Sequence, residues 1–396
     1  MQNLLESRTQ RGRIKMASFS EDEVIIYSHH APPHPSASAT RMVSLADHLR
    51  SKGAKVTFLT SKAGPSSYNG YSIIRCRGRI GLVANLTKRT RSPILISSPP
   101  ATPSAEVAIA ARALGYHVVV DVRDPYVSEA LKNGEIKPGI RSYIKLLLEK
   151  SLFRSAHSIS YVSEPLRDNI HESFGLINRP EAIAANGVDT AIFYRDMEHR
   201  NAIRSGLKIT DEALFVYAGI LGGKSLDKAF SAIAPALRSG CRLLMIAVLD
   251  DFSRPVLESL QAQAEALGIS DRIDWRFNLT LHDVAKHLNA CDIGLNPLPF
   301  NRSYCLPVKT FEYLACGVYP LNVVGKDSAL RTRFGDKVKM EFFEDWGSFS
   351  ARTLELIKEL PELRAGAESR ANAASLFDRN DANTVLATAL LPRHSS

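Results

Sequence analysis

Short apolar runs alternate with longer segments of helical periodicity along most of the chain. The runs are rich in valine, isoleucine and leucine and are apolar at nearly every position, which is typical of parallel strands buried on both faces. We predict strands at Val24–Ser28, Lys55–Thr60, Ser72–Arg75, Ile94–Ser97, His117–Asp121, Ser158–Val162, Ala213–Ala218, Arg242–Val248, Arg272–Phe277, Asp292–Asn296 and Val318–Val324. We predict helices between them, among others at Thr40–Lys52, Ser104–Leu114, Ile140–Arg154, Leu226–Leu237, Pro255–Leu267 and Leu281–Asn289.

The alternation runs through the chain twice, with a break at Asn186–Asp189, where Asn-Gly favours a turn. A length of 396 residues also favours two domains. We therefore predict an α/β protein with two doubly wound, Rossmann-like domains. The predicted parts are a flexible polar tail at 1–15, an N-terminal domain at 16–188, a C-terminal domain at 189–370, and a C-terminal helix and tail at 371–396.

Three features of the sequence indicate a cytoplasmic protein. No apolar run approaches the roughly 18 residues that a membrane-spanning helix needs, and the N-terminus lacks the apolar core of a signal peptide. The cysteines are odd in number, are scattered and include no C-x-x-C pair, which favours a reducing compartment and argues against a structural zinc site. They are Cys76, Cys241, Cys291, Cys305 and Cys316.

Positive charge is concentrated in the first half of the chain. The formal net charge is +9, and residues 1–185 carry +10 while residues 186–396 carry −1. A basic half indicates an anionic partner, which would be a nucleic acid, an anionic membrane surface or a phosphorylated substrate. No zinc-finger spacing or RNA-binding aromatic motif occurs, so we do not expect nucleic acid.

Two stretches of the basic half, 75–91 and 141–154, mix cations with apolar residues as interfacial segments do. For the first stretch, membrane contact and an ordinary surface helix remain equal alternatives. For the second, we favour a crossover helix whose apolar residues face the sheet. These residues are Ile144, Leu147, Leu148 and Leu152.

In open parallel sheets, ligands bind beyond the carboxyl ends of the strands. The loop after the first predicted strand holds small residues at Ser36–Ala39, which would let backbone N–H groups approach an anion at the start of a helix. The same loop holds His29, His30 and His34, which raises a metal site. Their spacing fits no familiar ligand pattern, so we favour partly solvated histidines and expect no metal.

The loop after the strand Ala213–Ala218 combines glycines, Lys224 and a helix start, which describes a cradle for phosphate. A P-loop would need its first glycine at the position of Ala218. The apolar run Leu243–Leu249 followed by Asp250 imitates a strand that ends in a magnesium-binding carboxylate. A P-loop NTPase therefore stays an alternative, as does a flexible loop with a solvated lysine.

Two further segments could carry chemistry. Asp124 follows a buried strand, where a carboxylate either caps a loop or helix or belongs to a site. Pro307 suits the start of a helix, and Lys309 and Glu312 lie on one side of it. They could form a surface ion pair, or Glu312 could bind sugar hydroxyls. No D-x-D motif occurs in the chain, so a bound diphosphate would have to be neutralised by cations and helix N-termini.

Taken together, these loops resemble the retaining glycosyltransferases of the GT-B fold, family 4, the group 1 transferases of bacterial polysaccharide and glycoconjugate assembly. The resemblance extends from Val24 to Gly335. The segments that carry it are Pro32-Pro33, Arg41–Gly53, Val120–Asp124, Val162–Glu164, Asn186–Asp189, Tyr217–Gly219 and Pro307–Gly317.

The resemblance implies a central cleft, with the acceptor on the N-terminal domain and the nucleotide sugar on the C-terminal domain. It implies catalytic roles for Asp124 near the transferred sugar, Lys224 at the diphosphate and Glu312 at the ribose hydroxyls. The implied donor-binding residues are Ser36, Ala37, Ser38, Gly219, Gly222, Gly223, Lys224, Arg302, Leu306, Pro307, Val308, Lys309 and Glu312. The implied acceptor or cleft residues are His34, Arg41, Arg123 and Asn186.

The chain departs from the family at two positions. Tyr304 stands where members often have the first glutamate of an E-x7-E pair, and Ile220 stands where many have a phosphate-binding arginine. Lys309 and Arg302 are candidates to replace the missing cation. A branch of the family also lacks the first glutamate, so we do not interpret these departures as a loss of activity.

The implied function is metal-independent, retaining transfer of a hexose or N-acetylhexosamine. The donor would be a nucleotide-diphosphate sugar, with a UDP-sugar favoured, and the acceptor a glycan or a lipid-linked glycan; no cofactor is expected. The basic N-terminal domain would place the enzyme at the inner face of a membrane. The alternative is a sugar-nucleotide epimerase or hydrolase on the same fold.

Overall fold

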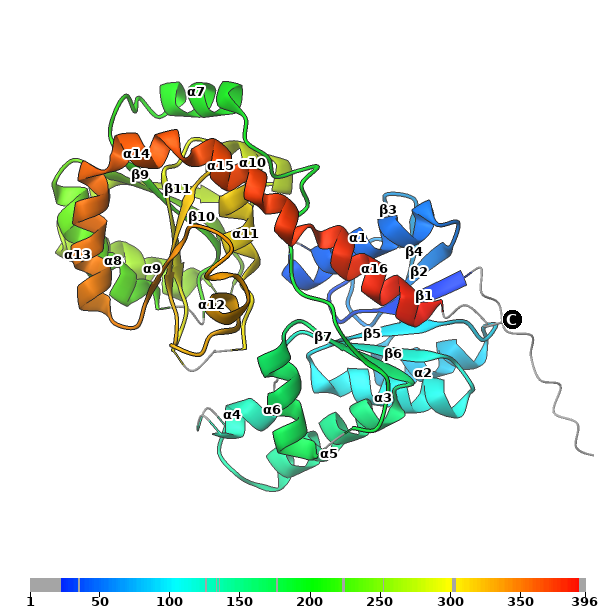
Figure 1. Cartoon of the computed structure of the whole chain (residues 1–396). Coiled ribbons are helices and arrows are strands. Elements are labelled where there is room, and N and C mark those ends of the chain that lie inside the picture. Colours follow the sequence, from blue (N-terminus) through cyan, green and yellow to red (C-terminus); the bar gives the residue numbers. More distant parts are fainter. Residues whose placement is uncertain are drawn as a thin grey trace, which may run out of the picture.

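The computed structural model describes residues 23–34, 36–124, 127–132, 134, 136–175, 177–222, 225–251, 253–300 and 304–391 (Figure 1). The predicted tail at 1–15 and three of the predicted donor-binding residues, Gly223, Lys224 and Arg302, lie outside these residues.

The first lobe is built on a sheet with the strand order β3-β4-β2-β1-β5-β6-β7-β8. Neighbouring strands are parallel, except that β3 runs antiparallel to β4. The strands are β1 (Glu23–Tyr27), β2 (Lys55–Thr60), β3 (Ser67–Tyr68), β4 (Tyr71–Arg75), β5 (Ile94–Ser98), β6 (Val118–Val122), β7 (Ser158–Tyr161) and β8 (Glu181–Ile183).

Helices cover both faces of this sheet, and successive residues of β1 supply the two apolar cores. Ile25 and Tyr27 pack with α2 (Gly78–Thr87), α3 (Ala101–Ala113), α5 (Ile140–Ser155) and α6 (Glu164–Phe174). Val24 and Ile26 pack with α1 (Ala37–Ser51) and α16 (Arg379–Leu390) on the other face. The short α4 (Val127–Lys132) contacts α5.

The second lobe is built on a parallel sheet with the strand order β11-β10-β9-β12-β13-β14. Its strands are β9 (Leu214–Ile220), β10 (Arg242–Val248), β11 (Ile273–Phe277), β12 (Ile293–Pro297), β13 (Tyr319–Val323) and β14 (Glu341–Phe343). Its helices are α7 (Met197–Gly206), α8 (Leu226–Arg238), α9 (Arg254–Ala266), α10 (Leu281–Asn289), α11 (Val308–Ala315), α12 (Ala329–Phe334), α13 (Trp346–Lys358), α14 (Leu360–Ala365) and α15 (Ala367–Asn372), with 3-10 turns at Ser270–Arg272 and Ala373–Phe377.

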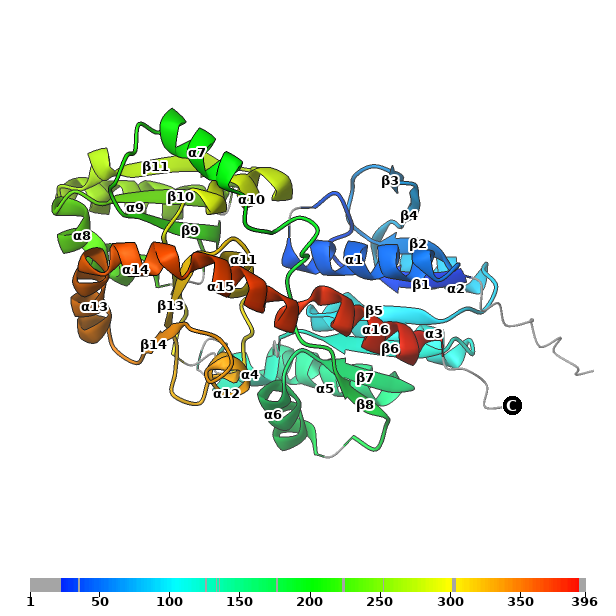
Figure 2. The same cartoon turned by 45° about the horizontal axis from the view of Figure 1, so that its top comes forward.

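The chain crosses between the lobes twice. The segment 184–196 leads from β8 to α7, and the turn after α15 leads back to α16, which lies against the first lobe (Figure 2). The two crossings pair with each other, because Val188 N donates to Phe377 O at 2.8 Å and Arg379 N donates to Val188 O at 2.9 Å. Gly187 permits this approach, since a Cβ at that position would collide with the carbonyl of Phe377.

The structure confirms the predicted α/β class, with two doubly wound parallel sheets and a C-terminal helical segment. All the strands predicted from apolar runs are present, with ends within two residues of the prediction. The short strands β3, β8 and β14 were not predicted, because two or three residues at a sheet edge leave no apolar run to detect.

The predicted orientation of α5 was right for Leu152, which is buried, and for Leu148, which packs against the core, but wrong for Ile144 and Leu147. The buried residues of α5 are Ser142, Glu149, Leu152 and Phe153, and they form the stripe that faces inward. Ile144 and Leu147 belong to the other side of the helix and are exposed to solvent. Within the described residues, no helix is both long enough and apolar enough to cross a bilayer.

Candidate functional site

Loops of the two lobes meet beyond the ends of β6 and β7. Ser163, just after β7, donates its hydroxyl to the carbonyl of Tyr304 at 2.8 Å. Cys305 Sγ lies 3.9 Å from Oδ1 of Asp124, just after β6. We call this region, where residues 304–306 of the second lobe lie on the first lobe, the lobe junction.

Tyr304 has a clear packing role at the lobe junction. Its side chain is buried among apolar residues of the first lobe, including Tyr161 and Val162. The residue that replaces the glutamate of the resembled family thus connects the two lobes by an apolar contact. A carboxylate at this position would be buried without water, which is unfavourable.

Arg41 lies inside the first lobe rather than on its surface. Its guanidinium binds Asp121 through two hydrogen bonds, from Nε at 2.9 Å and from Nη2 at 3.0 Å. Ser160 donates to the same carboxylate at 2.8 Å. Nη2 also donates to the carbonyl of Ala184 at 2.8 Å, and Nη1 lies 3.4 Å from Oδ1 of Asn186. Arg41 therefore positions the first crossing segment.

Asn186 continues this network into the second lobe. Its Nδ2 donates to the carbonyl of Leu306 at 2.9 Å. The side chain of Leu306 is buried in the core of the second lobe, where it precedes Pro307 and the first turn of α11. A chain of hydrogen bonds therefore runs from Asp121 through Arg41 and Asn186 to the start of α11.

Arg123 is oriented by groups of its own lobe. Its Nε donates to Ser97 Oγ at 3.0 Å and its Nη2 to the carbonyl of Pro99 at 3.2 Å. Burial lowers the pKa of Arg123, and the neighbouring carboxylates of Asp124 and Asp121 oppose this shift. The guanidinium is thus fixed beside Asp124 at the lobe junction.

The loop after β1 leads into α1, as the sequence predicts. Ser36 is the N-cap of α1, and its hydroxyl accepts a hydrogen bond from Ala39 N at 3.2 Å. The N–H groups of Ala37 and Ser38 stand at the first positions of the helix, where no carbonyl of the helix can accept them. Ala37 is exposed, so its backbone could face an anionic ligand.

Three histidines of this loop lie against one another. The rings of His30 and His34 stack with centroids 4.2 Å apart, and His29 meets His30 edge-on at 4.8 Å. Burial, reinforced by the neighbouring charges, lowers the pKa of His30 to about 4. Burial also lowers the pKa of His34, and the carboxylate of Asp250 in the second lobe partly opposes this shift. The loop therefore presents neutral imidazoles at pH 7.

The end of β9 is shaped around Lys309. Gly219 has a φ of 145°, and a Cβ built on it would lie 3.1 Å from Lys309 Nζ. The same ammonium lies 4.0 Å from the centroid of the Tyr217 ring, a cation–π contact. Tyr217 in turn donates its hydroxyl to the carbonyl of Ile220. This geometry keeps the cation of α11 directly beside the loop that leaves β9.

Glu312 lies one helical turn after Lys309, in an environment of two cations. Burial raises the pKa of its carboxyl, whereas Arg379 and Lys309 act in the opposite direction. Arg379 is buried at the start of α16 and donates Nη2 to the carbonyl of Gly187 at 3.1 Å. Reasoning from the sequence missed Arg379, because no local motif marks it and only the return of the chain after α15 brings it to Glu312.

Among the residues that the structure describes, no group of three or more His, Cys, Asp or Glu side chains is arranged to hold a metal ion. Two sets of predicted site residues are brought together. Asp124, Arg123, Asn186 and Leu306 are connected at the lobe junction. Gly219, Lys309 and Glu312 are connected at the edge of the second sheet.

No protein-family model and no curated protein sequence matches the chain. Solved structures do match. Anabaena HepE in complex with UDP-glucose has a TM-score of 0.74 at 15% identity, over 93% of this chain and 99% of that chain. WaaG, a glycosyltransferase involved in lipopolysaccharide biosynthesis, has 0.73 at 14% identity, over 93% and 99%. Sucrose-phosphate synthase from Thermosynechococcus elongatus has 0.73 at 12% identity, over 92% and 97%.

Each of these matches covers 92% or 93% of the chain, and so both lobes. The chain has the GT-B fold of glycosyltransferases, with two Rossmann-like domains and a C-terminal helical segment.

Proposed function

We propose that the protein is a glycosyltransferase that moves a sugar from a nucleotide-diphosphate donor to a glycan or lipid-linked acceptor. The observation that carries the proposal is the group formed by Gly219, Lys309 and Glu312 at the carboxyl edge of the second sheet. In parallel α/β sheets this edge is where nucleotides bind. The similarity to a structure that contains UDP-glucose supports a UDP-sugar as the donor.

Two residues of this group, Lys309 and Glu312, have a chemical role in the proposal. The ammonium of Lys309 would bind the diphosphate, together with the predicted Lys224 and Arg302. Glu312 would bind the ribose hydroxyls through its carboxyl oxygens; burial raises the pKa of this carboxyl, and the cations Arg379 and Lys309 partly oppose that shift. Cations held in place before the reaction stabilise the charge that develops on the departing diphosphate without requiring a metal ion.

The first lobe would bind the acceptor. The proposed contacts are His34, Arg123 and Asp124, and the exposed N-terminus of α1 at Ala37 would approach the donor phosphates. The transfer would proceed with retention at the anomeric carbon, as the resemblance to family 4 implies. The sugar transferred would be a hexose or an N-acetylhexosamine.

The test begins with the nucleotide. UDP, GDP, ADP and CMP are screened for a rise in thermal unfolding temperature, since a ligand of the folded state alone raises apparent stability. We expect UDP to give the largest rise, and Lys309→Ala to reduce it, while Lys358→Ala at the exposed end of α13 leaves it unchanged. A screen in which none of the four nucleotides stabilises the protein would contradict the proposal.

The connection between β9 and α8 argues against the alternative of a P-loop NTPase. A P-loop needs a long glycine-rich turn between strand and helix. Here β9 continues to Ile220 and α8 starts at Leu226, so that only residues 221–225 connect them.

We further propose that the first lobe contacts an anionic membrane surface. Four apolar residues of α5 share one helix face at spacings of three, four and seven residues: Ile140 (78% exposed), Tyr143 (60%), Ile144 (50%) and Leu147 (46%). Arg141 and Lys145 lie among them in sequence. Ile80 of α2, flanked by Arg77 and Arg79, is also exposed, and α3 contacts both α2 and α5. Apolar residues among cations are typical of interfacial helices.

Sedimentation with vesicles tests this contact. We expect the protein to sediment with vesicles that contain anionic lipid and to be released by salt. Ile144→Glu should weaken sedimentation, whereas Leu354→Glu, at an exposed position of α13 in the second lobe, should not. Absence of binding at low salt would exclude the contact.

A further inference from the structure

A cavity that several arginines line lies at the edge of the second sheet that is opposite to the donor group. Asp292 and Gly317, two of its lining residues, come directly before β12 and β13. Glu312 and Gly219 belong to the other edge, and a strand of five residues spans about 16 Å. The cavity has a volume of about 250 Å³, and its charged lining consists of Asp292 and four arginines. We call it the arginine cavity; its arginines are Arg195, Arg200, Arg364 and Arg370.

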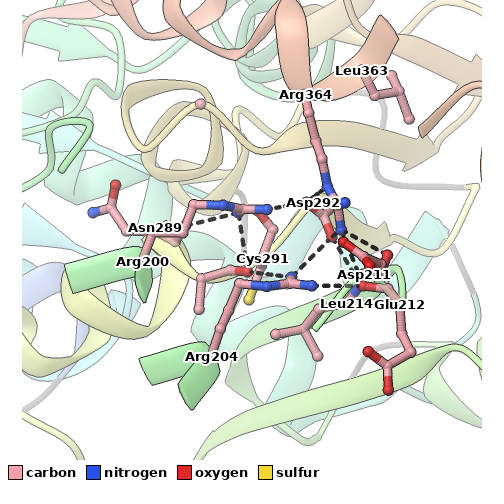
Figure 3. A network of polar contacts seen from close by, with 12 residues as sticks. Arg200, Arg204, Asp211, Glu212, Leu214, Asn289, Cys291, Asp292, Leu363 and Arg364 are labelled. Carbon is pink, nitrogen blue, oxygen red and sulfur yellow. Dashed lines mark hydrogen bonds and ion pairs between the residues drawn. The ribbon is translucent and has the colours of Figure 1, made fainter. Parts of the chain in front are cut away.

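The carboxylate of Asp292 is already shared among several arginines (Figure 3). It accepts from Arg200 Nη2 at 2.7 Å, from Arg364 Nε at 3.1 Å and from Arg204 Nη1 at 3.3 Å. Leu214 N donates to it as well, at 3.0 Å. One negative charge therefore serves three guanidinium groups, and little of it remains for the other arginines of the cavity.

Arg370 is buried without a carboxylate partner among the described residues. Its Nη2 donates to the carbonyls of Gly317 at 2.9 Å and Leu363 at 2.6 Å, so its contacts are neutral acceptors. Burial lowers the pKa of Arg370 to about 10; Arg195 acts in the same direction, while Tyr319 and Asp292 oppose the shift only in part. A buried cation that lacks an anion is costly, because neutral carbonyls replace only part of its hydration.

Arg195 also approaches Gly317. A Cβ on Gly317 would lie 2.8 Å from Arg195 Nη1, while the carbonyl of Gly317 already accepts from Arg370. The partner of Arg195 is Glu368 at 3.1 Å, whose side chain is 70% exposed. Ion pairs with exposed partners are weak. Two cations thus converge on Gly317 with little compensating charge.

We propose that the arginine cavity binds a small oxyanion with several negative charges, of the phosphate or diphosphate class. Guanidinium groups bind such oxygens through paired, charge-assisted hydrogen bonds. The volume lies below the range of roughly 300–1,000 Å³ that is usual for larger ligands. The cavity therefore suits an inorganic or terminal phosphate group rather than a whole nucleotide, and this inference is independent of the proposed function.

The position of the cavity gives this binding a consequence for the whole protein. Arg195 lies at the end of the first crossing segment, and Arg370 lies in α15, directly before the second crossing. An oxyanion bound by both arginines would connect the two crossings at the base of the second lobe. We expect it to restrict the movement of one lobe against the other.

The experiment uses inorganic diphosphate and hydrogen exchange measured by mass spectrometry, at constant ionic strength with chloride as the reference. We expect slower exchange in peptides that cover 195–206 and 360–372. Calorimetric titration should show that Arg195→Gln and Arg370→Gln each weaken diphosphate binding at least about tenfold. Lys358→Gln removes the same charge from the exposed end of α13 and should stay within about twofold of the wild type.

Two results would overturn the proposal. One is slower exchange that is confined to the loops after β1 and β9, because diphosphate would then occupy only the proposed donor site. The other is an affinity for diphosphate that is unchanged in Arg195→Gln. This variant keeps the buried network around Asp292, so the test remains valid even if Arg370→Gln does not fold. Either result leaves the proposed function intact, since that is tested separately by the nucleotide screen.

Discussion

At the residue scale, Gly219 determines how closely Lys309 approaches the loop after β9. Its φ of 145° lies in a region that other residues rarely adopt, and the ammonium of Lys309 occupies the space next to its Cα. A side chain at this position would both strain the backbone and displace the ammonium of Lys309.

We expect Gly219→Ala to lower the free energy of unfolding by about 1–2 kcal/mol and to weaken UDP binding by about tenfold. The second effect follows because Lys309 has to move away from the donor group. Gly206→Ala, where a Cβ would meet nothing within 4 Å, is the control and should change stability by less than about 0.5 kcal/mol. Urea unfolding and UDP titration measure both effects; wild-type affinity in Gly219→Ala would remove Lys309 from the donor site.

The pair Arg41–Asp121 is the buried ion pair of the first lobe for which the structure shows the fullest set of partners. Asp121 is completely buried, and Arg41 also holds Ala184 and Asn186. Removal of one partner from such a pair leaves a charge without compensation, which is more destabilising than the loss of a surface pair.

Asp121→Asn should therefore lower the free energy of unfolding by about 3–5 kcal/mol in urea titrations. Asp168→Asn is the control. Asp168 pairs with Arg167, and its side chain is 62% exposed, so this variant should lower the free energy of unfolding by less than about 1 kcal/mol. Equal effects of the two variants would show that the Arg41 network contributes no more than a surface contact.

At the scale of elements, the histidines of the loop between β1 and α1 make the stability of the protein depend on pH. The ring of His30 stacks on that of His34 and meets that of His29 edge-on, and burial lowers the pKa of His30 from 6.5 to about 4. Between these values the unfolded chain binds a proton that the folded chain does not bind. Stability is therefore present above about pH 6.5 and is lost as the pH falls towards 4.

We expect the free energy of unfolding to fall between pH 7 and pH 5 by about 1 kcal/mol on account of His30, less than the full shift implies because water partly screens the ring. His30→Phe keeps an aromatic ring in the stack but cannot titrate, and should flatten the pH dependence of the unfolding temperature. His282→Phe at an exposed position of α10 should leave it unchanged. A slope in His30→Phe equal to that of the wild type would assign the pH dependence to other groups.

The elements themselves show which features of the fold sequence reasoning could detect. The strands at the centre of each sheet could be predicted, since burial on both faces requires apolar residues at nearly every position. Helix α11 could be predicted from Pro307 and Gly317, which mark its two ends. The inward stripe of α5 could not, because it contains Ser142 and Glu149, polar residues that hydrogen-bond inside the lobe.

In the candidate site, too, some contacts could be predicted from the sequence and others could not. Lys309 and Glu312 stand three residues apart on one helix, so their proximity follows from the sequence. Tyr217 and Arg379 come from distant elements, β9 and α16, and only the packing of the whole chain brings them to α11. Ile220 is exposed and directs no cation toward the site, whereas Lys309 occupies the space beside Gly219.

At the scale of the whole molecule, α16 belongs in sequence to the second half but in structure to the first lobe. It packs on α1, β6 and β8, and its Leu386 and Leu390 are fully buried in that lobe's core. Further contacts are made by Asn383, which donates to Ser44 Oγ at 2.9 Å, and by the carbonyl of Ala389, which lies 2.9 Å from Nε2 of His117.

Leu386→Ala should destabilise the first lobe by about 2–5 kcal/mol, since the cavity cannot be filled by its neighbours without strain. Thr388→Ala, on the exposed side of the same helix, should be nearly neutral. Hydrogen exchange can assign the effect: faster exchange is expected in β6 and α1, not in the strands of the second lobe. Faster exchange only in the second lobe would show that α16 does not support the first.

The return of α16 also determines the order in which the protein can be completed during its synthesis. The ribosome delivers β1 to β8 first. The apolar face of α1, with Met42, Leu45 and Leu49, also packs with α16, whose residues are made about 340 positions later. The strands of the first lobe can cover part of this face, but the part that packs on α16 stays open to solvent or to other chains until α16 is made. The nascent first lobe is therefore the stage at which we expect the protein to depend most on protection by chaperones.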